Sequence, residues 1–131
     1  MPNWVLVDTC IWASFFAKPS SIEKREVDAL IDTGRVALIG PILSEVLMGF
    51  RKPNQAKWVA SRLRLTHWIG MDWNDWRQAA DLGRDLSANG KKIPLTDLVL
   101  ASIAIRRDLP LYSIDPHFDL IPGLKRYTPS A

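Results

Sequence analysis

The stretch WVLVDTCIW, residues 4–12, decides the fold. Residues 4–7 form a short apolar run rich in valine, which predicts a buried strand ending at Asp8. Residues 9–16 are again mostly apolar and predict a short helix directly after the strand. A strand that runs straight into a helix is the first half of a parallel strand–helix–strand unit. One acid therefore stands alone at the junction of two apolar segments.

Three further acids are isolated in the same way. They stand in the segments GPILSEVLMGF (Glu45), KKIPLTDLVLASIAI (Asp97) and LPLYSIDPHF (Asp115). Burying an ionised carboxylate costs roughly several kcal/mol unless a cation or good hydrogen bonds compensate it. Because four such acids occur in one small basic chain, we predict a common site in which a divalent metal ion supplies the missing positive charge.

Strands and helices alternate along the rest of the chain. The patterns predict further strands over 36–39, 65–69 and 109–113, and a short edge strand over 125–127. They predict helices over 22–33 (capped by Ser21, closed by Gly34), 42–49, 55–63, from a cap at Asp72 or Asn74 to near 89–90, and 98–107 (capped by Thr96). This alternation predicts an α/β fold, with a parallel sheet covered on both faces by helices, in a single domain spanning residues 1–131.

Composition limits the class of protein. With 131 residues, 47% of them hydrophobic, the chain can bury a core of its own. The single cysteine, Cys10, excludes an internal disulfide and a cysteine-based zinc cluster. The chain opens without a leader pattern and has no apolar run long enough for a membrane span, so we expect a cytoplasmic protein.

The distribution of charge points to a polyanionic partner. The net charge is +3, from 17 basic and 14 acidic residues, and it becomes +7 when the four isolated acids are set aside. A basic surface around a local acidic pocket suits a polyanion that must reach a metal ion. An ordinary basic protein is the plainer interpretation of the same numbers.

The predicted topology brings the four acids together. Asp8 and Asp115 follow parallel strands at the carboxyl edge, where ligand crevices form in such sheets. Asp97 opens one helix and Glu45 lies within another, and we expect both helices to begin above that edge. Oxygen ligands of this kind suit Mg²⁺ or Mn²⁺, and a metal-activated water can hydrolyse a phosphodiester.

Each acid also has a structural explanation when it is taken alone. Asp8 can cap the following helix, Asp97 can be first-turn charge, and Asp115 before a proline is an ordinary turn residue. Capping cannot explain Glu45, which lies mid-helix among aliphatic residues. The two histidines, His67 and His117, show no obvious second partner for metal-free cleavage. His67 is expected to be a surface or structural residue, and His117 is either structural or a contact to substrate.

The four acidic segments, in this order and spacing, resemble the PIN-domain family and, more narrowly, the VapC toxins of bacterial toxin–antitoxin pairs. The resemblance rests on LVDTCIW, SEVLMGF, LTDLVLASIAI and LYSIDPHF taken together, and it covers essentially the whole chain. It implies a three-layer α/β/α domain with a central, mostly parallel sheet. It also implies a Mg²⁺- or Mn²⁺-dependent endoribonuclease that leaves a 5′-phosphate and a 3′-hydroxyl.

The resemblance also implies roles for the four acids and for partner proteins. Asp8 and Asp97 are implied to be principal metal ligands, and Glu45 and Asp115 to complete the pocket directly or through water. The family further implies a homodimer and a small VapB-like antitoxin that covers the pocket. An antitoxin arginine reaching the acids would replace the charge of the metal.

Other residues are less sharply assigned. Thr9 and Ser113 match polar positions that flank the pocket and hold either ligands or a phosphate. Asp119 is a fifth acid or a solvated turn acid, and Cys10 stands where a small hydroxyl residue is often found. Among three basic clusters we prefer the pair Lys91 and Lys92 for contact with RNA phosphates, since it precedes the Asp97 segment; the other clusters are Arg51, Lys52 and Lys57, and Arg106 and Arg107.

Aromatic residues are unusually frequent in two regions. We expect core packing for most of them and interface contacts for one or two; they are Trp12, Phe15 and Phe16, then Trp58, Trp68, Trp73 and Trp76.

The residues that define two competing classes of protein are absent from this chain. An aspartyl phosphatase of the haloacid dehalogenase type would carry a second aspartate where Cys10 stands. A response-regulator receiver would carry an aspartate between Glu45 and Asp72, where this chain has no acid. A PIN-like module that binds nucleic acid or protein without cutting it stays open as the alternative, although all four acids are present.

Overall fold

A four-stranded parallel sheet forms the centre of the structure, a computed structural model that describes residues 3–130. The strand order is β3-β2-β1-β4, with β1 at Val5–Val7, β2 at Val36–Leu38, β3 at His67–Trp68 and β4 at Leu111–Tyr112. All three residues of β1 and of β2 are buried. Strands covered on both faces read as continuous apolar runs, which is why these two segments do not alternate with polar residues.

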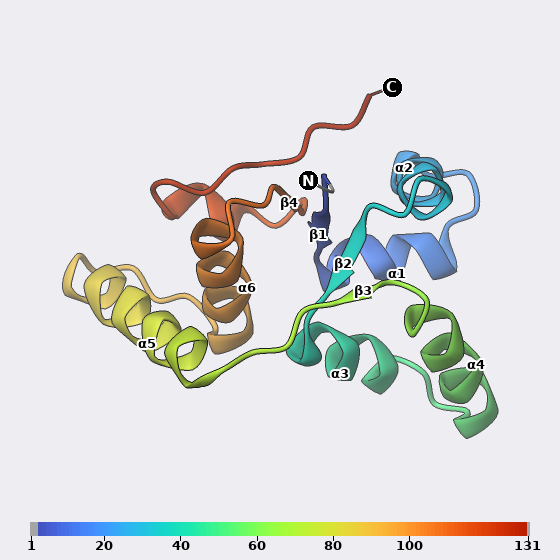
Figure 1. Cartoon of the computed structure of the whole chain (residues 1–131), viewed down its shortest axis with the longest axis horizontal. Helices are drawn as coiled ribbons and strands as arrows, with labels where there is room; N and C mark the ends of the chain where they lie inside the picture. The colour runs from blue at the N-terminus through green and yellow to red at the C-terminus, as the bar shows by residue number, and fades with distance from the viewer. Residues whose placement is uncertain (1–2, 131) are drawn as a thin grey trace.

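Paired helices connect successive strands and cover the two faces of the sheet (Figure 1). They are α1 (Thr9–Ala17) with α2 (Ile22–Asp32), α3 (Gly40–Met48) with α4 (Pro53–Leu63), and α5 (Trp73–Ala88) with α6 (Leu95–Arg106). The chain moves outward from β1 to β3 and then returns to the far side of β1. Right-handed crossovers therefore place α5 and α6 on the face opposite the first four helices. The predicted α/β/α fold is confirmed.

Helix α6 is the more deeply buried of the two helices in its layer. Seven consecutive residues, from Leu98 to Ala104, are buried. Helix α5 packs along it, and a Cβ atom at Gly83 would lie 2.8 Å from a methyl group of Leu98. The missing side chain at Gly83 therefore permits the close approach of these two helices. Within residues 3–130, no helix is long and apolar enough to cross a lipid bilayer.

The observed boundaries correct several predictions. The helix predicted over 98–107 begins earlier, at Leu95, with Pro94 as its N-cap residue. Thr96 lies in the first turn and is not the cap. The strand predicted over 65–69 is limited to β3, and the one predicted over 125–127 is a single bridge between Leu111 and Arg126. The cap at Ser21 is present, since its hydroxyl accepts a hydrogen bond from the Lys24 amide at 3.0 Å.

The tryptophans also differ from expectation. Trp12 is buried, with 1% of its surface exposed, as predicted for core packing. The four later tryptophans are largely exposed, so the expectation of core packing for most aromatic residues was wrong; they are Trp58, Trp68, Trp73 and Trp76. Trp58 lies on α4, and Trp73 and Trp76 lie on α5; these helices turn other residues, Val59 and Ala79, toward the core. Trp68 lies on the edge strand β3.

Candidate functional site

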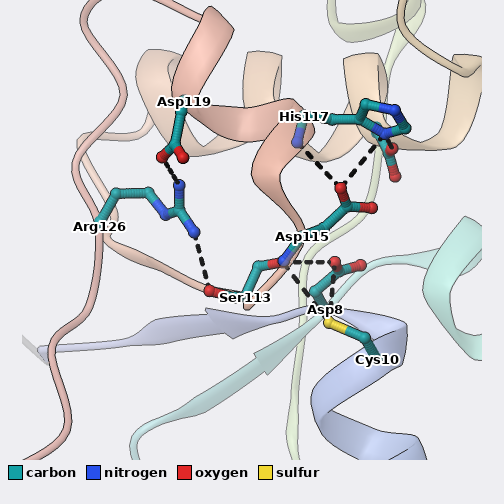
Figure 2. A network of polar contacts seen from close by, with 8 residues as sticks. Asp8, Cys10, Ser113, Asp115, His117, Asp119 and Arg126 are labelled. Atoms are coloured by element: carbon teal, nitrogen blue, oxygen red, sulfur yellow. Dashed lines mark hydrogen bonds and ion pairs between the residues drawn. The ribbon is translucent and has the colours of Figure 1, made fainter.

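The pocket begins where β1 and β4 end side by side. Val7 pairs with Tyr112 in the register of these parallel strands, so the next residues, Asp8 and Ser113, emerge together at the carboxyl edge. The Asp8 amide donates a hydrogen bond to the Tyr112 carbonyl at 3.0 Å. The chain leaves β1 and β4 in different directions here, and such a switch point is where α/β sheets form ligand crevices. Figure 2 shows the resulting cluster of polar side chains.

Asp8 is a buried carboxylate held by hydrogen bonds alone. It is 4% exposed; one oxygen accepts from the Thr9 amide at 2.7 Å, and the other from the Ser113 hydroxyl at 2.8 Å and the Cys10 thiol at 3.5 Å. Burial raises the pKa of Asp8; these donors oppose that effect, and the charge of Asp115 adds to it. Asp8 therefore caps α1, as its structural explanation required, and still lacks a counter-ion.

Ser113 ties the two sides of the pocket together. Its hydroxyl donates to Asp8 and accepts from the Asp115 amide at 3.0 Å, and it is buried. Asp115 in turn accepts from the His117 amide at 2.9 Å and caps a short 3₁₀ helix, η1 (Pro116–Leu120). The Ser113 hydroxyl thus has partners inside the protein, which favours its role as a holder of ligands over contact with a phosphate.

Asp97 enters the pocket from the first turn of α6. Its side chain is 14% exposed. Burial raises the pKa of Asp97, as do the nearby charges of Asp8 and Asp115, and the hydrogen bond with His117 opposes them. Three carboxylates at one spot therefore share an electrostatic penalty, and a divalent cation would relieve it.

His117 is a pocket residue for which the sequence left two roles open, a structural one and contact with substrate. Its Nδ1 atom lies 3.3 Å from an oxygen of Asp97 and 3.3 Å from an oxygen of Asp115. No second partner for His117 could be predicted from the sequence, because nothing in the chain order shows that α6 starts beside η1. Its position two residues after Asp115 was the one available signal.

Glu45 lies at the rim of the pocket and is exposed, which corrects the premise that it is buried among aliphatic residues. Its neighbour Val46 and Ile42 face the core, and the turn of α3 directs Glu45 outward. It nevertheless joins the pocket, since its carboxylate accepts a hydrogen bond from the Thr9 hydroxyl at 2.7 Å.

Two other buried acids have partners that compensate the cost of burying their charge. Asp75 is 1% exposed and forms ion pairs with Arg106 and Arg107. Glu26 is 6% exposed and accepts from the Tyr127 hydroxyl and from the amide and hydroxyl of Ser130. Burial would raise the pKa of Glu26, but these three donors outweigh it and the pKa is lowered.

The pocket acids have no such cation. Within residues 3–130, no lysine or arginine forms an ion pair with Asp8, Glu45, Asp97 or Asp115. A donor set of carboxylate oxygens that is partly buried and has no counter-ion fits a hard divalent cation such as Mg²⁺ or Mn²⁺.

The remaining predicted residues lie outside the pocket. The Asp119 side chain is 74% exposed and pairs with Arg126 at 2.9 Å, which agrees with a solvated turn acid (Figure 2). Lys91 and Lys92 lie between α5 and α6, and neither side chain forms an ion pair with any residue that the structure describes. The basic pair Arg106 and Arg107 is engaged by Asp75.

Comparison with known proteins points to one family. A model of the PIN domain matches residues 5–124. VapBC2 from Rickettsia felis, bound to a DNA fragment from their promoter, superposes with a TM-score of 0.80 and 21% identity over 94% of this chain and 96% of that one. DNA-bound VapBC from Salmonella typhimurium gives 0.78 and 20%, over 97% and 98% of the chains.

A third similar solved structure is that of a toxin described by the RNA that it cleaves. VapC20 from Mycobacterium tuberculosis, a sarcin–ricin loop cleaving toxin, has a TM-score of 0.68 and 14% identity over 92% of this chain and 97% of that one. At these identities the likeness is one of fold. No curated protein sequence matches the chain.

Proposed function

Since this chain belongs to the PIN-domain family, we propose that it is a metal-dependent endoribonuclease and the toxin of a VapBC-type toxin–antitoxin pair. One observation carries the proposal: Asp8 is buried without a cation beside Asp97 and Asp115. Such an arrangement stabilises neither the fold nor the charge by itself, so it is best explained by a ligand of opposite charge.

The carboxylates divide the work of holding that ligand. Asp8 and Asp97 are the principal ligands of Mg²⁺ or Mn²⁺, and Asp115 and Glu45 act directly or through water. When bound, the ion lowers the pKa of a water molecule and neutralises charge on the phosphodiester. Ser113 holds the Asp8 carboxylate and the start of the Asp115 turn in place, and Thr9 holds Glu45 at the rim.

The RNA substrate would approach over the loop between α5 and α6. Lys91 and Lys92 are unpaired cations within the described chain and lie on the segment that leads into Asp97. Phosphate contacts of this kind position a nucleic acid without reading its sequence. From the resemblance to the family, we expect hydrolysis to break the bond between phosphorus and the 3′ oxygen, which leaves a 5′-phosphate and a 3′-hydroxyl.

An apolar hollow offers a place for the antitoxin. It has a volume of about 240 Å³ and lies between α1, α2 and α4, lined by residues that include Trp12, Phe15, Phe16, Ile31, Trp58 and Leu65. None of the four acids lines it, so it is not the site of the reaction. We assign it to an apolar segment of a VapB-like antitoxin whose basic side chain reaches the acids. A homodimer completes the proposed assembly, with one or two of the exposed tryptophans outside the hollow, Trp68, Trp73 and Trp76, as contacts.

Cleavage of RNA by the purified protein tests the enzymatic proposal. Structured RNA is incubated with and without Mn²⁺, and the ends of the products are sequenced. We expect metal-dependent cleavage by the natural sequence, loss of cleavage in Asp8→Asn and Asp97→Asn, and full cleavage in Asp85→Asn, which changes an exposed acid outside the pocket. Binding of RNA without cleavage in Mn²⁺ would instead identify a non-catalytic module.

Inhibition by an antitoxin peptide tests the proposed partner. A peptide that combines an apolar helix with one arginine is compared with the same peptide carrying alanine in place of the arginine. We expect the second peptide to bind the hollow but to leave RNA cleavage largely uninhibited. Equal inhibition by both peptides would refute the idea that a cation replaces the metal.

A further inference from the structure

His117 stands in the pocket, and the roles assigned so far leave it unused. We propose that His117 is a ligand of the same metal ion and that it gives the site a preference for Mn²⁺ over Mg²⁺. The inference rests on the proposed function, since it concerns the ion held by Asp97 and Asp115. It adds a nitrogen donor to a site otherwise built from oxygen.

The spacing of the atoms is that of one coordination shell. The Nδ1 atom of His117 is 3.3 Å from Asp97 Oδ2 and 3.3 Å from Asp115 Oδ1. Ligand atoms of all three residues lie within 4.8 Å of one another. Neighbouring ligands in an octahedral shell with bonds of about 2.1 Å are about 3 Å apart, and opposite ligands are about 4.2 Å apart. One ion can therefore contact all three side chains after small adjustments.

The same distances make the contact between His117 and Asp97 a long hydrogen bond. A charge-assisted bond between a ring nitrogen and a carboxylate is typically about 2.7–2.9 Å long. The ring nitrogen is 3.3 Å from a carboxylate oxygen of Asp97 and 3.3 Å from one of Asp115, which is longer than this range in both cases. The Asp115 carboxylate is already positioned by the His117 amide at 2.9 Å, so the ring is not needed to hold it.

The ring is carried by a well-anchored segment. His117 lies on η1, which packs against α6, and the next residue, Phe118, is 1% exposed. The His117 side chain is 45% exposed, whereas that of Asp97 is 14% exposed. The Asp115 side chain is 31% exposed, so His117 is the most exposed of the three side chains and is accessible to an ion from solvent.

The chemistry of the donor sets the expected selectivity. Mg²⁺ is a hard ion that keeps oxygen ligands and waters, so an imidazole adds little to its binding. Mn²⁺ also favours oxygen ligands, but it stands at the start of the first-row series along which affinity for a given site with nitrogen or oxygen donors rises. As a transition-metal ion it accepts an imidazole more readily than Mg²⁺ does. We therefore expect His117→Gln to weaken Mn²⁺ binding by about tenfold or more and Mg²⁺ binding by no more than about threefold.

Pulsed electron paramagnetic resonance of bound Mn²⁺ tests ligation without relying on activity. The untagged full chain is loaded with one equivalent of Mn²⁺ and examined for nitrogen modulation, with natural histidine and with ¹⁵N-histidine. His67 is the matched control, because it is the only other histidine and stacks on Trp4 instead of joining the acids. We expect a histidine signal that His117→Gln abolishes and His67→Gln retains.

The outcomes separate this inference from the proposed function. Bound Mn²⁺ without a histidine signal would overturn the role of His117 and leave the metal site intact. An absence of any Mn²⁺ binding to the natural sequence would overturn both. Calorimetry of metal binding tests the selectivity. Equal losses of Mn²⁺ and Mg²⁺ affinity in His117→Gln would refute the proposal that His117 favours Mn²⁺. Should that variant fail to fold, the isotope shift in the natural sequence and its retention in His67→Gln still decide ligation.

Discussion

Asp8 and Asp75 are both buried aspartates, and they differ in what surrounds the charge. Asp75 meets two arginines, whereas Asp8 meets only hydrogen-bond donors and other acids. A buried charge without a partner destabilises the folded protein, while removal of one member of a buried pair leaves the other uncompensated. The same substitution should therefore have opposite effects at these two positions.

We expect Asp8→Asn to raise the unfolding free energy of the metal-free protein by about 1 kcal/mol, since asparagine keeps the helix cap and removes the charge. We expect Asp75→Asn to lower it by roughly 2–3 kcal/mol, below the range for fully buried pairs because both arginines are partly exposed. Urea unfolding of both variants without metal measures the two values. A loss of stability in Asp8→Asn would contradict the view that the charge of Asp8 is uncompensated in the metal-free protein.

Ser113 is the residue whose effect on the pocket should be indirect. Ser113→Ala removes the hydroxyl that donates to Asp8 and accepts from the Asp115 amide. We expect Mn²⁺ affinity, measured by calorimetry, to fall about 10–100-fold, the usual effect of losing a group that orients metal ligands. Ser113→Thr keeps the hydroxyl and should restore most of the affinity. Equal weakening in both variants would show that packing, and not the hydroxyl, matters.

At the level of single residues, the sequence predicted which acids lie close together better than it predicted their exposure and their ion-pair partners. Asp8 and Asp115 follow strands whose ends must lie together, so their proximity could be predicted from chain order alone. The exposure of Glu45 could not, because an apolar helix of nine residues does not reveal which side faces the core. The arginine partners of Asp75 come from the far end of α6, a contact that no local pattern shows.

Among the elements, α2 shows how a single backbone angle ends a helix. Gly34 follows α2 with φ of +68°, and a Cβ added there would meet nothing within 4 Å. The cost of a side chain at this position is therefore purely conformational. Gly70 has the same open surroundings without a positive φ, which makes it a matched control.

We expect Gly34→Ala to lower the unfolding free energy by about 1 kcal/mol, because alanine is disfavoured in the left-handed region. Gly70→Ala should be neutral or slightly stabilising, since it restricts the unfolded chain alone. Thermal unfolding of the two variants measures the difference. Equal melting temperatures would mean that the turn after α2 relaxes to another conformation at little cost.

Elements were predictable where hydrophobic runs and caps agreed. β1, β2 and the start of α2 follow directly from such signals in the sequence. The start of α6 did not, because Pro94 and Thr96 are both acceptable near a helix start and the choice between them depends on packing against α5. β3 is short because only His67 and Trp68 pair with residues of β2, and the pairing ends at the hydrogen bond from the Ile69 amide to the Leu38 carbonyl.

In the whole molecule, the C-terminal segment is fastened across the core. Tyr127 and Ser130 bond to Glu26 on α2, and Arg126 donates to the carbonyl of Ser113. Tyr112, on the neighbouring strand, is 2% exposed, and burial, with smaller effects of Glu23 and Glu26, raises its pKa to about 12.

Alkaline pH should therefore weaken the fold. A tyrosine pKa raised from 10.0 to about 12 means that the unfolded chain releases the proton first. The contribution of Tyr112 to stability is complete below pH 10 and is lost as pH rises toward about 12. We expect the natural sequence to lose roughly 1–2 kcal/mol more between pH 9 and pH 11 than Tyr112→Phe, by urea unfolding. Equal losses would place the alkaline sensitivity elsewhere.

The order of the pocket residues along the chain has a consequence for synthesis. Asp8 is made early, whereas Asp97, Ser113 and Asp115 come more than 85 positions later. A growing polypeptide that has reached only α5 carries one wall of the pocket and none of its opposite wall. On the proposed function, the growing chain could not cleave RNA until residue 115 has emerged and β4 has joined the sheet.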